Sequence, residues 1–147
     1  GLLVPVVGFL PVGDERVQNT IDAVQERLTD EKGLVRRYDG EDGLPGEEGA
    51  FLWCSFWLVD ALALSGRVEE AEDVFTSLRG FVNEVGLLAE EIDPETGSHL
   101  GNFPQGFSHI GLINSALYLA HAKDGGQSAT KPMGMRLGDG VSFGNSE

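Results

Sequence analysis

Two Glu-Glu pairs in glycine-rich stretches are the residues of this sequence best suited to acid–base chemistry. Glu47 and Glu48 lie in the run GLPGEEGAF, and Glu90 and Glu91 lie in the run GLLAEEID. Hydrolysis of a glycosidic bond needs two carboxyl groups, one to protonate the leaving oxygen and one to act on water or on the sugar. The chain has 24 acidic residues, so a Glu-Glu pair alone is weak support for this chemistry.

Polar side chains suited to sugar contacts follow the second pair. The run DPETG at residues 93–97 predicts a turn, and the run GNFPQGFSHIG comes after it. Asn102, Gln105 and His109 can hydrogen-bond sugar hydroxyls, and we predict that they contact substrate. Ser108 has the alternative role of capping the next helix, and a single histidine also has structural alternatives.

Four segments have the hydrophobic periodicity of helices, and they must position these side chains. The segments are residues 14–28, 49–65, 68–82 and 107–121. The first and third are amphipathic, whereas the second and fourth are apolar on almost all sides, which indicates buried helices. Asp14 is the predicted N-cap of the first, and Gly66 ends the second. Residues 2–10 are also apolar and form either the end of a buried helix or a buried extended piece.

Buried and amphipathic helices therefore alternate along the chain. The links from buried to amphipathic segments are short, whereas those in the other direction, residues 29–48 and 83–106, are long. If neighbouring helices are antiparallel, both long loops lie at the N-terminal ends of the inner helices, where a pocket can open. The pattern predicts an all-α fold of antiparallel helical hairpins, stacked as in an α/α toroid, with a helix bundle as the alternative.

Charge and composition exclude several functional classes. A formal net charge of −14 argues against a nucleic-acid partner, and the chain lacks the long apolar run of a membrane span. The single Cys54 lies in an apolar run and is expected to be a buried structural thiol. This cysteine usage and the absence of a visible signal peptide lead us to expect a cytoplasmic protein. Because no metal-ligand spacing or phosphate loop is visible, we expect no metal and no cofactor.

The two motif regions together resemble a known family. The runs EGAFLWCSFWLVDALALSGRVEEAE and GLLAEEIDPETGSHLGNFPQGFSHIGLINSAL, with the opening LLVPVVGFLPVGDERVQNTIDAVQERLTDEKGLVRRY, are similar to glycoside hydrolase family 15. This family includes glucoamylases, glucodextranases and some prokaryotic trehalases. The resemblance implies that residues 1–121 are the C-terminal portion of an (α/α)6 catalytic barrel. We expect the glycine-rich residues 122–147 to be a flexible tail.

The resemblance also implies a mechanism. Family members invert the configuration at α-glucosidic bonds, and their general base matches Glu90, with Glu91 as the fallback assignment. The family's general acid lies in a motif that this chain does not contain. Glu47 and Glu48 could stand in for it, but we favour substrate contact or loop scaffolding for Glu48, with Trp53 near the same rim. A position in the core is the alternative for Trp53, as it is for Trp57.

The expected substrate is an α-glucoside or oligosaccharide, and the 147-residue chain alone is expected to be inactive. The alternative interpretation is a non-catalytic helical module, for sugar binding or assembly, that lacks the general acid. A partial barrel would leave its apolar inner helices exposed, so we also expect the chain to self-associate.

Overall fold

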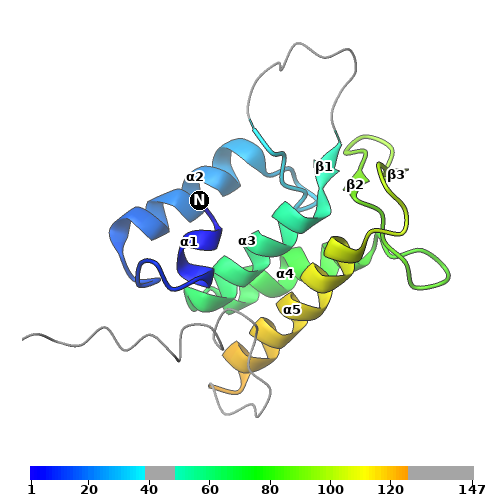
Figure 1. The fold of residues 1–147 in the computed structure, drawn as a ribbon. Coiled ribbons are helices and arrows are strands. Elements are labelled where there is room, and N and C mark those ends of the chain that lie inside the picture. Colours follow the sequence, from blue (N-terminus) through cyan, green and yellow to red (C-terminus); the bar gives the residue numbers. More distant parts are fainter. Residues whose placement is uncertain (39–48, 126–147) are drawn as a thin grey trace, which may run out of the picture.

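Helices dominate the computed structural model, which describes residues 1–38 and 49–125 (Figure 1). The helices are α1 (Leu3–Val6), α2 (Glu15–Leu28), α3 (Leu52–Leu64), α4 (Val68–Arg79) and α5 (Gly106–Lys123). Three short strands, β1 (Ala50–Phe51), β2 (Glu91–Ile92) and β3 (His99–Leu100), complete the described elements. The architecture confirms the predicted mostly helical fold, which is compatible with part of a helical toroid.

Helix α3 lies at the centre of the molecule, and α5 lies beside it and runs in the same direction (Figure 1). Trp53 contacts Phe107 near the N-terminal ends of both helices. Further along, Ser115 of α5 contacts Phe56 and Asp60 of α3. Because α4 returns antiparallel between them in sequence, α3 and α5 have the relationship expected of successive inner helices.

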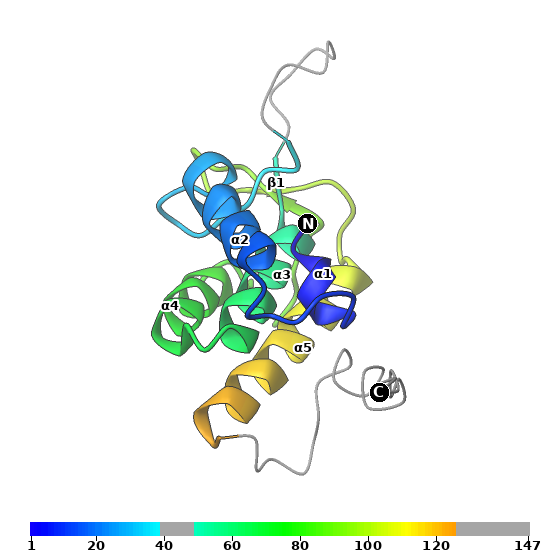
Figure 2. The ribbon, with the colours of Figure 1, turned by 90° about the vertical axis from the view of Figure 1, so that its left-hand side faces the viewer.

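The amphipathic helices cover this centre. The Asp14 side chain accepts a hydrogen bond from the Arg16 amide and caps α2, as predicted. Helix α2 buries Val17 and Ile21 and lies in front of α3 in Figure 2. A tight turn at Gly66, whose φ of 79° suits glycine, separates α3 from α4.

The N-terminal apolar segment contains a helical turn, so the alternative of a buried extended piece is wrong. It forms the single helical turn α1 followed by further turns. Leu2 and Val6 are buried in the core, whereas the side chain of Phe9 is 77% exposed. Gly8, whose φ is 70°, lies just beyond α1 and ends the helical turn there.

A small antiparallel sheet, in the order β1-β2-β3, lies at the N-terminal ends of α3 and α5. Ala50 pairs with Ile92, so residues 50–51 form a strand and not the first turn of the predicted helix. The predicted turn at residues 93–97 connects β2 to β3. Helix α4 ends at Arg79, three residues before the predicted end.

The two long loops meet at this end, as the alternation of helices predicted. In the part of the first loop that the structure describes, the Lys32 ammonium donates a hydrogen bond of 2.5 Å to the Pro94 carbonyl of the second. Within residues 1–38 and 49–125, no helix is long and apolar enough to cross a membrane.

Candidate active site

The backbone of Glu90 joins the second long loop to the inner helices. Its N–H donates to the Asn102 carbonyl at 3.0 Å, and its own carbonyl accepts from the Leu52 N–H at 3.1 Å. Leu52 is the first residue of α3, where amide groups have no partner inside the helix. Glu90 therefore occupies a fixed position at the N-terminal end of α3.

The two residues before Glu90 are held by the first turn of α5. The Leu88 carbonyl accepts from the Gln105 N–H at 2.9 Å, and the Leu88 N–H donates to His109 Nε2 at 3.3 Å. The Ser108 hydroxyl donates to the Ala89 carbonyl at 2.7 Å. Since Leu88, Ala89 and Ser108 are buried, these hydrogen bonds satisfy groups that water does not reach.

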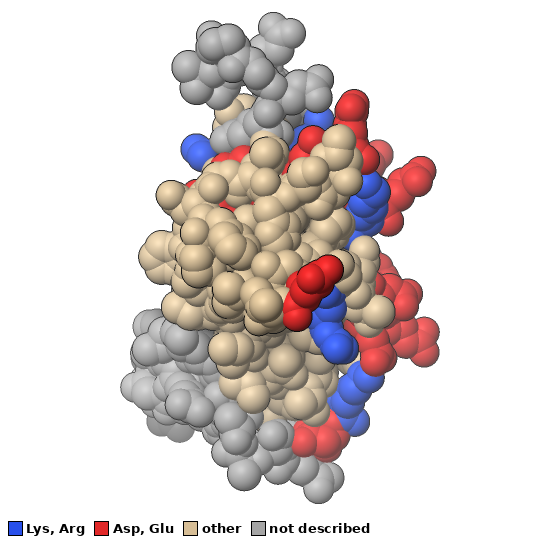
Figure 3. Space-filling model, turned by 90° about the vertical axis from the view of Figure 1, so that its right-hand side faces the viewer, with Lys and Arg blue, Asp and Glu red and all other residues tan. Residues whose placement is uncertain are grey.

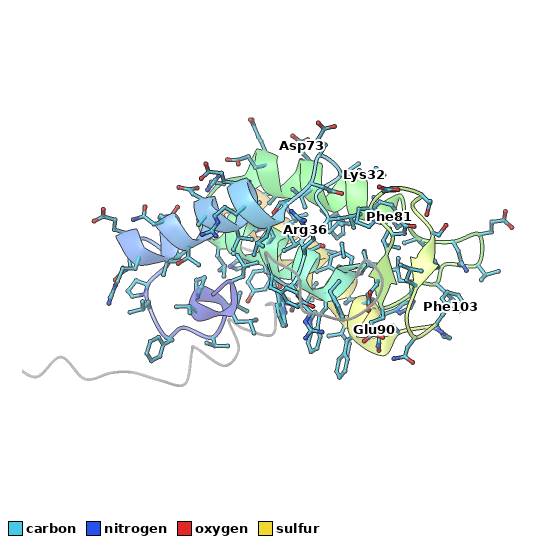
Figure 4. The ribbon with its side chains drawn as sticks, turned by 90° about the horizontal axis from the view of Figure 1, so that it is seen from above. Lys32, Arg36, Asp73, Phe81, Glu90 and Phe103 are labelled. Carbon is cyan, nitrogen blue, oxygen red and sulfur yellow. The ribbon has the colours of Figure 1, made fainter. Side chains whose placement is uncertain are left out.

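The carboxylate of Glu90 has one oxygen engaged and one available. Oε2 accepts hydrogen bonds from Asn102 at 3.1 Å from the backbone N–H and at 2.8 Å from Nδ2. No other residue in the described ranges bonds to Oε1. A Cβ on Gly101 would lie 2.9 Å from Oε2, so only glycine allows this close approach. Figure 4 shows Glu90 at the sheet end of the molecule, with Phe103 beyond it.

Glu91 has a different environment from Glu90, because successive residues of an extended chain point to opposite sides. It belongs to β2, where it pairs with Phe51 of β1 and Leu100 of β3. Its Oε2 lies 2.7 Å from where a Cβ on Gly49 would be, so its carboxylate packs against the residue that precedes β1. The two glutamates are not interchangeable in position.

An aromatic pair lies at the same end of the inner helices. The rings of Trp53 and Phe107 stack at 4.3 Å between centroids with planes 6° apart, and the Phe107 side chain is 51% exposed. Trp57, 4.9 Å from Trp53, packs against the hydrophobic core, as does the partly buried Cys54. The sequence interpretation did not single out Phe107, although an aromatic residue at the start of an apolar helix was a visible signal.

The other predicted contact residues have different roles, and among those that the structure describes only Asn102 bonds to Glu90. Asn102 is exposed and bonds to the Glu90 carboxylate. Gln105 caps α5 by accepting from the Phe107 N–H at 3.3 Å, which is the capping role considered for Ser108. Both ring nitrogens of His109 contact backbone groups, namely the Gln105 carbonyl at 2.7 Å and the Leu88 N–H. Glu48, like Glu47, lies outside the described residues.

Asp60, which the sequence interpretation missed, is a buried carboxyl group between α3 and α5. Its Oδ1 accepts from the Ser115 hydroxyl at 2.6 Å and its Oδ2 from Asn114 Nδ2 at 3.1 Å. Burial raises the pKa of Asp60 to about 7, although both hydrogen bonds oppose this effect. Asp60 is the one charged residue in α3. A single acidic residue in an otherwise apolar run could have identified this buried carboxyl group from the sequence.

The outer face of α5 is apolar and exposed. The residues Phe107, Ile110 and Ile113 are 51%, 46% and 62% exposed. Figure 3 shows that most of the right-hand face of the molecule is uncharged and that acidic and basic side chains gather along one margin. In the described ranges, no group of three or more His, Cys, Asp or Glu side chains could hold a metal ion.

Comparison with known proteins identifies the family. Residues 1–117 match the model of the glycosyl hydrolases family 15. The chain belongs to glycoside hydrolase family 15. This family 15 chain is 47% identical over 131 residues to a trehalase of Mycobacterium tuberculosis, with 87% of the chain and 19% of that protein covered. It is 40% identical over 121 residues to a trehalase of Thermoplasma volcanium, with 82% of the chain and 19% of that protein covered.

A trehalase of Mycolicibacterium smegmatis is 45% identical over 131 residues, with 87% of the family 15 chain and 20% of that protein covered. The chain thus spans about a fifth of the length of the curated relatives that it matches. No solved structure matches it.

Proposed function

We propose that this chain supplies the general base, Glu90, of an inverting hydrolase that acts on α-glucosidic bonds, with trehalose as the first substrate to test. The observation that carries the proposal is that only one of the two carboxylate oxygens of Glu90, Oε2, is engaged in hydrogen bonds to other described residues. Asn102 holds Oε2 through two N–H donors, which fixes the orientation of the carboxylate. Oε1 is then the oxygen that takes a proton from water as that water attacks the anomeric carbon.

The surroundings of Glu90 support this role. Glu90 is half-buried, so it has contact with solvent while its backbone is held on both sides. An inverting reaction requires the general acid to stand about 6.5–9.5 Å from the base, with the water between base and sugar. We propose that Trp53, with Asn102 and Gln105, contacts the sugar from the N-terminal ends of the inner helices. Glu48 stays a predicted contact, because it lies outside the described residues.

The choice of trehalose follows from the three relatives described above, all of which are named trehalases. Inversion at one anomeric carbon of an α,α-linked disaccharide releases one β-glucose and one α-glucose. Retention would release two α-glucose molecules. Time-resolved NMR of the first products therefore tests the stereochemistry directly, and two α-anomers would contradict the proposal.

Glu90→Gln in the whole protein that contains this chain tests the base assignment. The substitution keeps the shape and the hydrogen-bonding reach of the side chain but removes its ability to accept a proton. We expect kcat for trehalose to fall by about 10²–10⁴-fold. Glu95→Gln, in the exposed turn between β2 and β3, is the control for loss of one acidic charge. Near-normal kcat in Glu90→Gln would refute the assignment to Glu90. If Glu91→Gln showed the expected loss of kcat and Glu90→Gln did not, Glu91 would be the base instead.

The 147-residue chain by itself is proposed to be inactive, because one carboxyl group cannot serve as both acid and base in one inverting step. The alternative of a non-catalytic module applies to this isolated chain. Hydrolysis of trehalose or maltose by the purified chain, abolished by Glu90→Gln, would refute both the proposed inactivity of the isolated chain and the non-catalytic alternative.

A further inference from the structure

We propose that His109 is a positioning residue for Glu90 and that it acts as a neutral imidazole carrying its proton on Nδ1. The inference rests on the proposed role of Glu90, but the tautomer can be tested without any activity. His109 lies in the first turn of α5, and its ring spans the gap between that turn and the loop that leads into Glu90.

The hydrogen bonds of the ring determine where the proton is. Nδ1 lies 2.7 Å from the Gln105 carbonyl oxygen, which can only accept, so Nδ1 must donate. Nε2 lies 3.3 Å from the Leu88 nitrogen, whose N–H can only donate, so Nε2 must accept. The neutral Nδ1–H tautomer satisfies both contacts, whereas a proton on Nε2 would face the Leu88 N–H.

The two bonds of His109 differ in importance. The Gln105 carbonyl also receives the His109 backbone N–H at 3.4 Å, so it keeps a helical partner if the ring is lost. The Leu88 N–H donates to His109 Nε2, and the Leu88 side chain is completely buried. Loss of the Nε2 acceptor therefore leaves an unsatisfied buried donor two residues before Glu90.

His99 provides an internal comparison, because there the other ring nitrogen, Nε2, must carry a proton. Its Nε2 lies 2.7 Å from the Phe81 carbonyl oxygen, so Nε2 must donate there. The structure thus assigns the proton to Nδ1 in His109 and to Nε2 in His99. The chain has three histidines, and His99→Asn and His121→Asn variants are sufficient to assign the signals.

Imidazole ¹⁵N NMR of the 147-residue chain at neutral pH tests the tautomer. We expect His109 Nδ1 to resonate as a protonated nitrogen and Nε2 as an unprotonated one, with His99 Nε2 protonated in the same spectrum. A His109 ring with its proton on Nε2, an averaged mixture of tautomers, or a doubly protonated ring would overturn the proposal.

A pair of conservative variants tests the effect on the loop. Gln can place an acceptor oxygen where Nε2 lies, whereas Asn can replace only the nearer Nδ1–H donor. His109→Gln should keep Leu88 amide exchange close to the wild-type rate, and His109→Asn should accelerate it roughly tenfold or more. His99→Asn, which alters the other ring, should leave the Leu88 rate unchanged. Equal Leu88 exchange in His109→Asn and the wild type would overturn the positioning role.

In the whole protein, His109→Asn should lower kcat roughly tenfold with KM little changed, and His109→Gln should restore most of that loss. A raised KM with unchanged kcat in both variants would instead identify His109 as a substrate contact. If Glu90→Gln retains activity while the tautomer and exchange results hold, the base assignment fails and the loop-positioning role stands. If the tautomer result fails, the proposal for His109 falls whatever Glu90 does.

Discussion

Asp60→Asn should stabilise the fold at neutral and alkaline pH but not at acidic pH. Asp60 is 2% exposed between α3 and α5, and burial raises its pKa from 3.8 to about 7. When protonated, Asp60 can donate to the Ser115 hydroxyl, which in turn can donate to the Phe56 carbonyl at 3.1 Å. Asparagine can reproduce this arrangement, with its amide nitrogen toward Ser115 and its oxygen toward Asn114.

The direction of the pH effect follows from proton binding. The unfolded chain releases the Asp60 proton near pH 4, whereas the folded chain retains it up to about pH 7. Between these values the folded state binds more protons, so the free energy of unfolding falls as pH rises. At 1.36 kcal/mol per pKa unit, the difference between 3.8 and about 7 corresponds to about 4 kcal/mol. Local rearrangement around the charge will reduce this, and we expect about 2–4 kcal/mol above pH 7.

Urea denaturation of the wild type and Asp60→Asn, followed by tryptophan fluorescence from pH 4.5 to pH 8, measures this effect. The advantage of Asp60→Asn should grow by up to about 1.4 kcal/mol per pH unit and level off near pH 7. Asp73→Asn, on the exposed side of α4 (Figure 4), makes the same charge change and should show no such trend. A difference between wild type and Asp60→Asn that is constant with pH would refute the buried-charge reasoning.

Three further results are expected. Gly111→Ala should lower the free energy of unfolding by about 1–3 kcal/mol, because its Cβ would lie 2.8 Å from Phe56 Cδ2. The control Gly106→Ala, whose Cβ would meet nothing within 4 Å, should be nearly neutral. Equal effects of the two substitutions would contradict the packing argument. Arg67→Ala should cost about 1 kcal/mol in low salt, because it removes the 2.6 Å ion pair with Asp22 that links α4 to α2, and an effect that does not shrink in high salt would argue against it. The isolated chain should self-associate through the exposed apolar face of α5, and light scattering that detects only monomer would oppose this.

The helices were predictable because their signals are local. The alternation of amphipathic and apolar segments identified α2 to α5, and Asp14 and Gly66 marked two of their ends correctly. The three strands were not predicted, because two-residue strands have no periodicity and depend on pairing between distant residues such as Ala50 and Ile92. Tertiary pairing therefore replaced the first turn of the expected helix.

The candidate site shows the same division between local and distant information. The alternation of link lengths predicted that the loops meet at the N-terminal ends of the inner helices, and the family motif pointed to Glu90. Neither could reveal that His109 bonds to Leu88, since that contact joins residues 21 positions apart. Asp60 was visible as an exception in an apolar run, but its partner Ser115 lies 55 positions away.

The backbone of Glu90 is tied to both α3 and α5, so we expect its position to depend on the spacing of these helices. The Leu52 N–H of α3 donates a hydrogen bond to the Glu90 carbonyl. The Ser108 hydroxyl of α5 donates one to the preceding Ala89 carbonyl. A substitution that moves the helices apart must therefore stretch one of these bonds or turn the peptide between them. Gly111 lies at the contact between the helices, so its replacement by alanine should weaken catalysis in the whole protein as well as stability. A Gly111→Ala enzyme with reduced stability but unaltered kcat would show that the loop follows one helix alone.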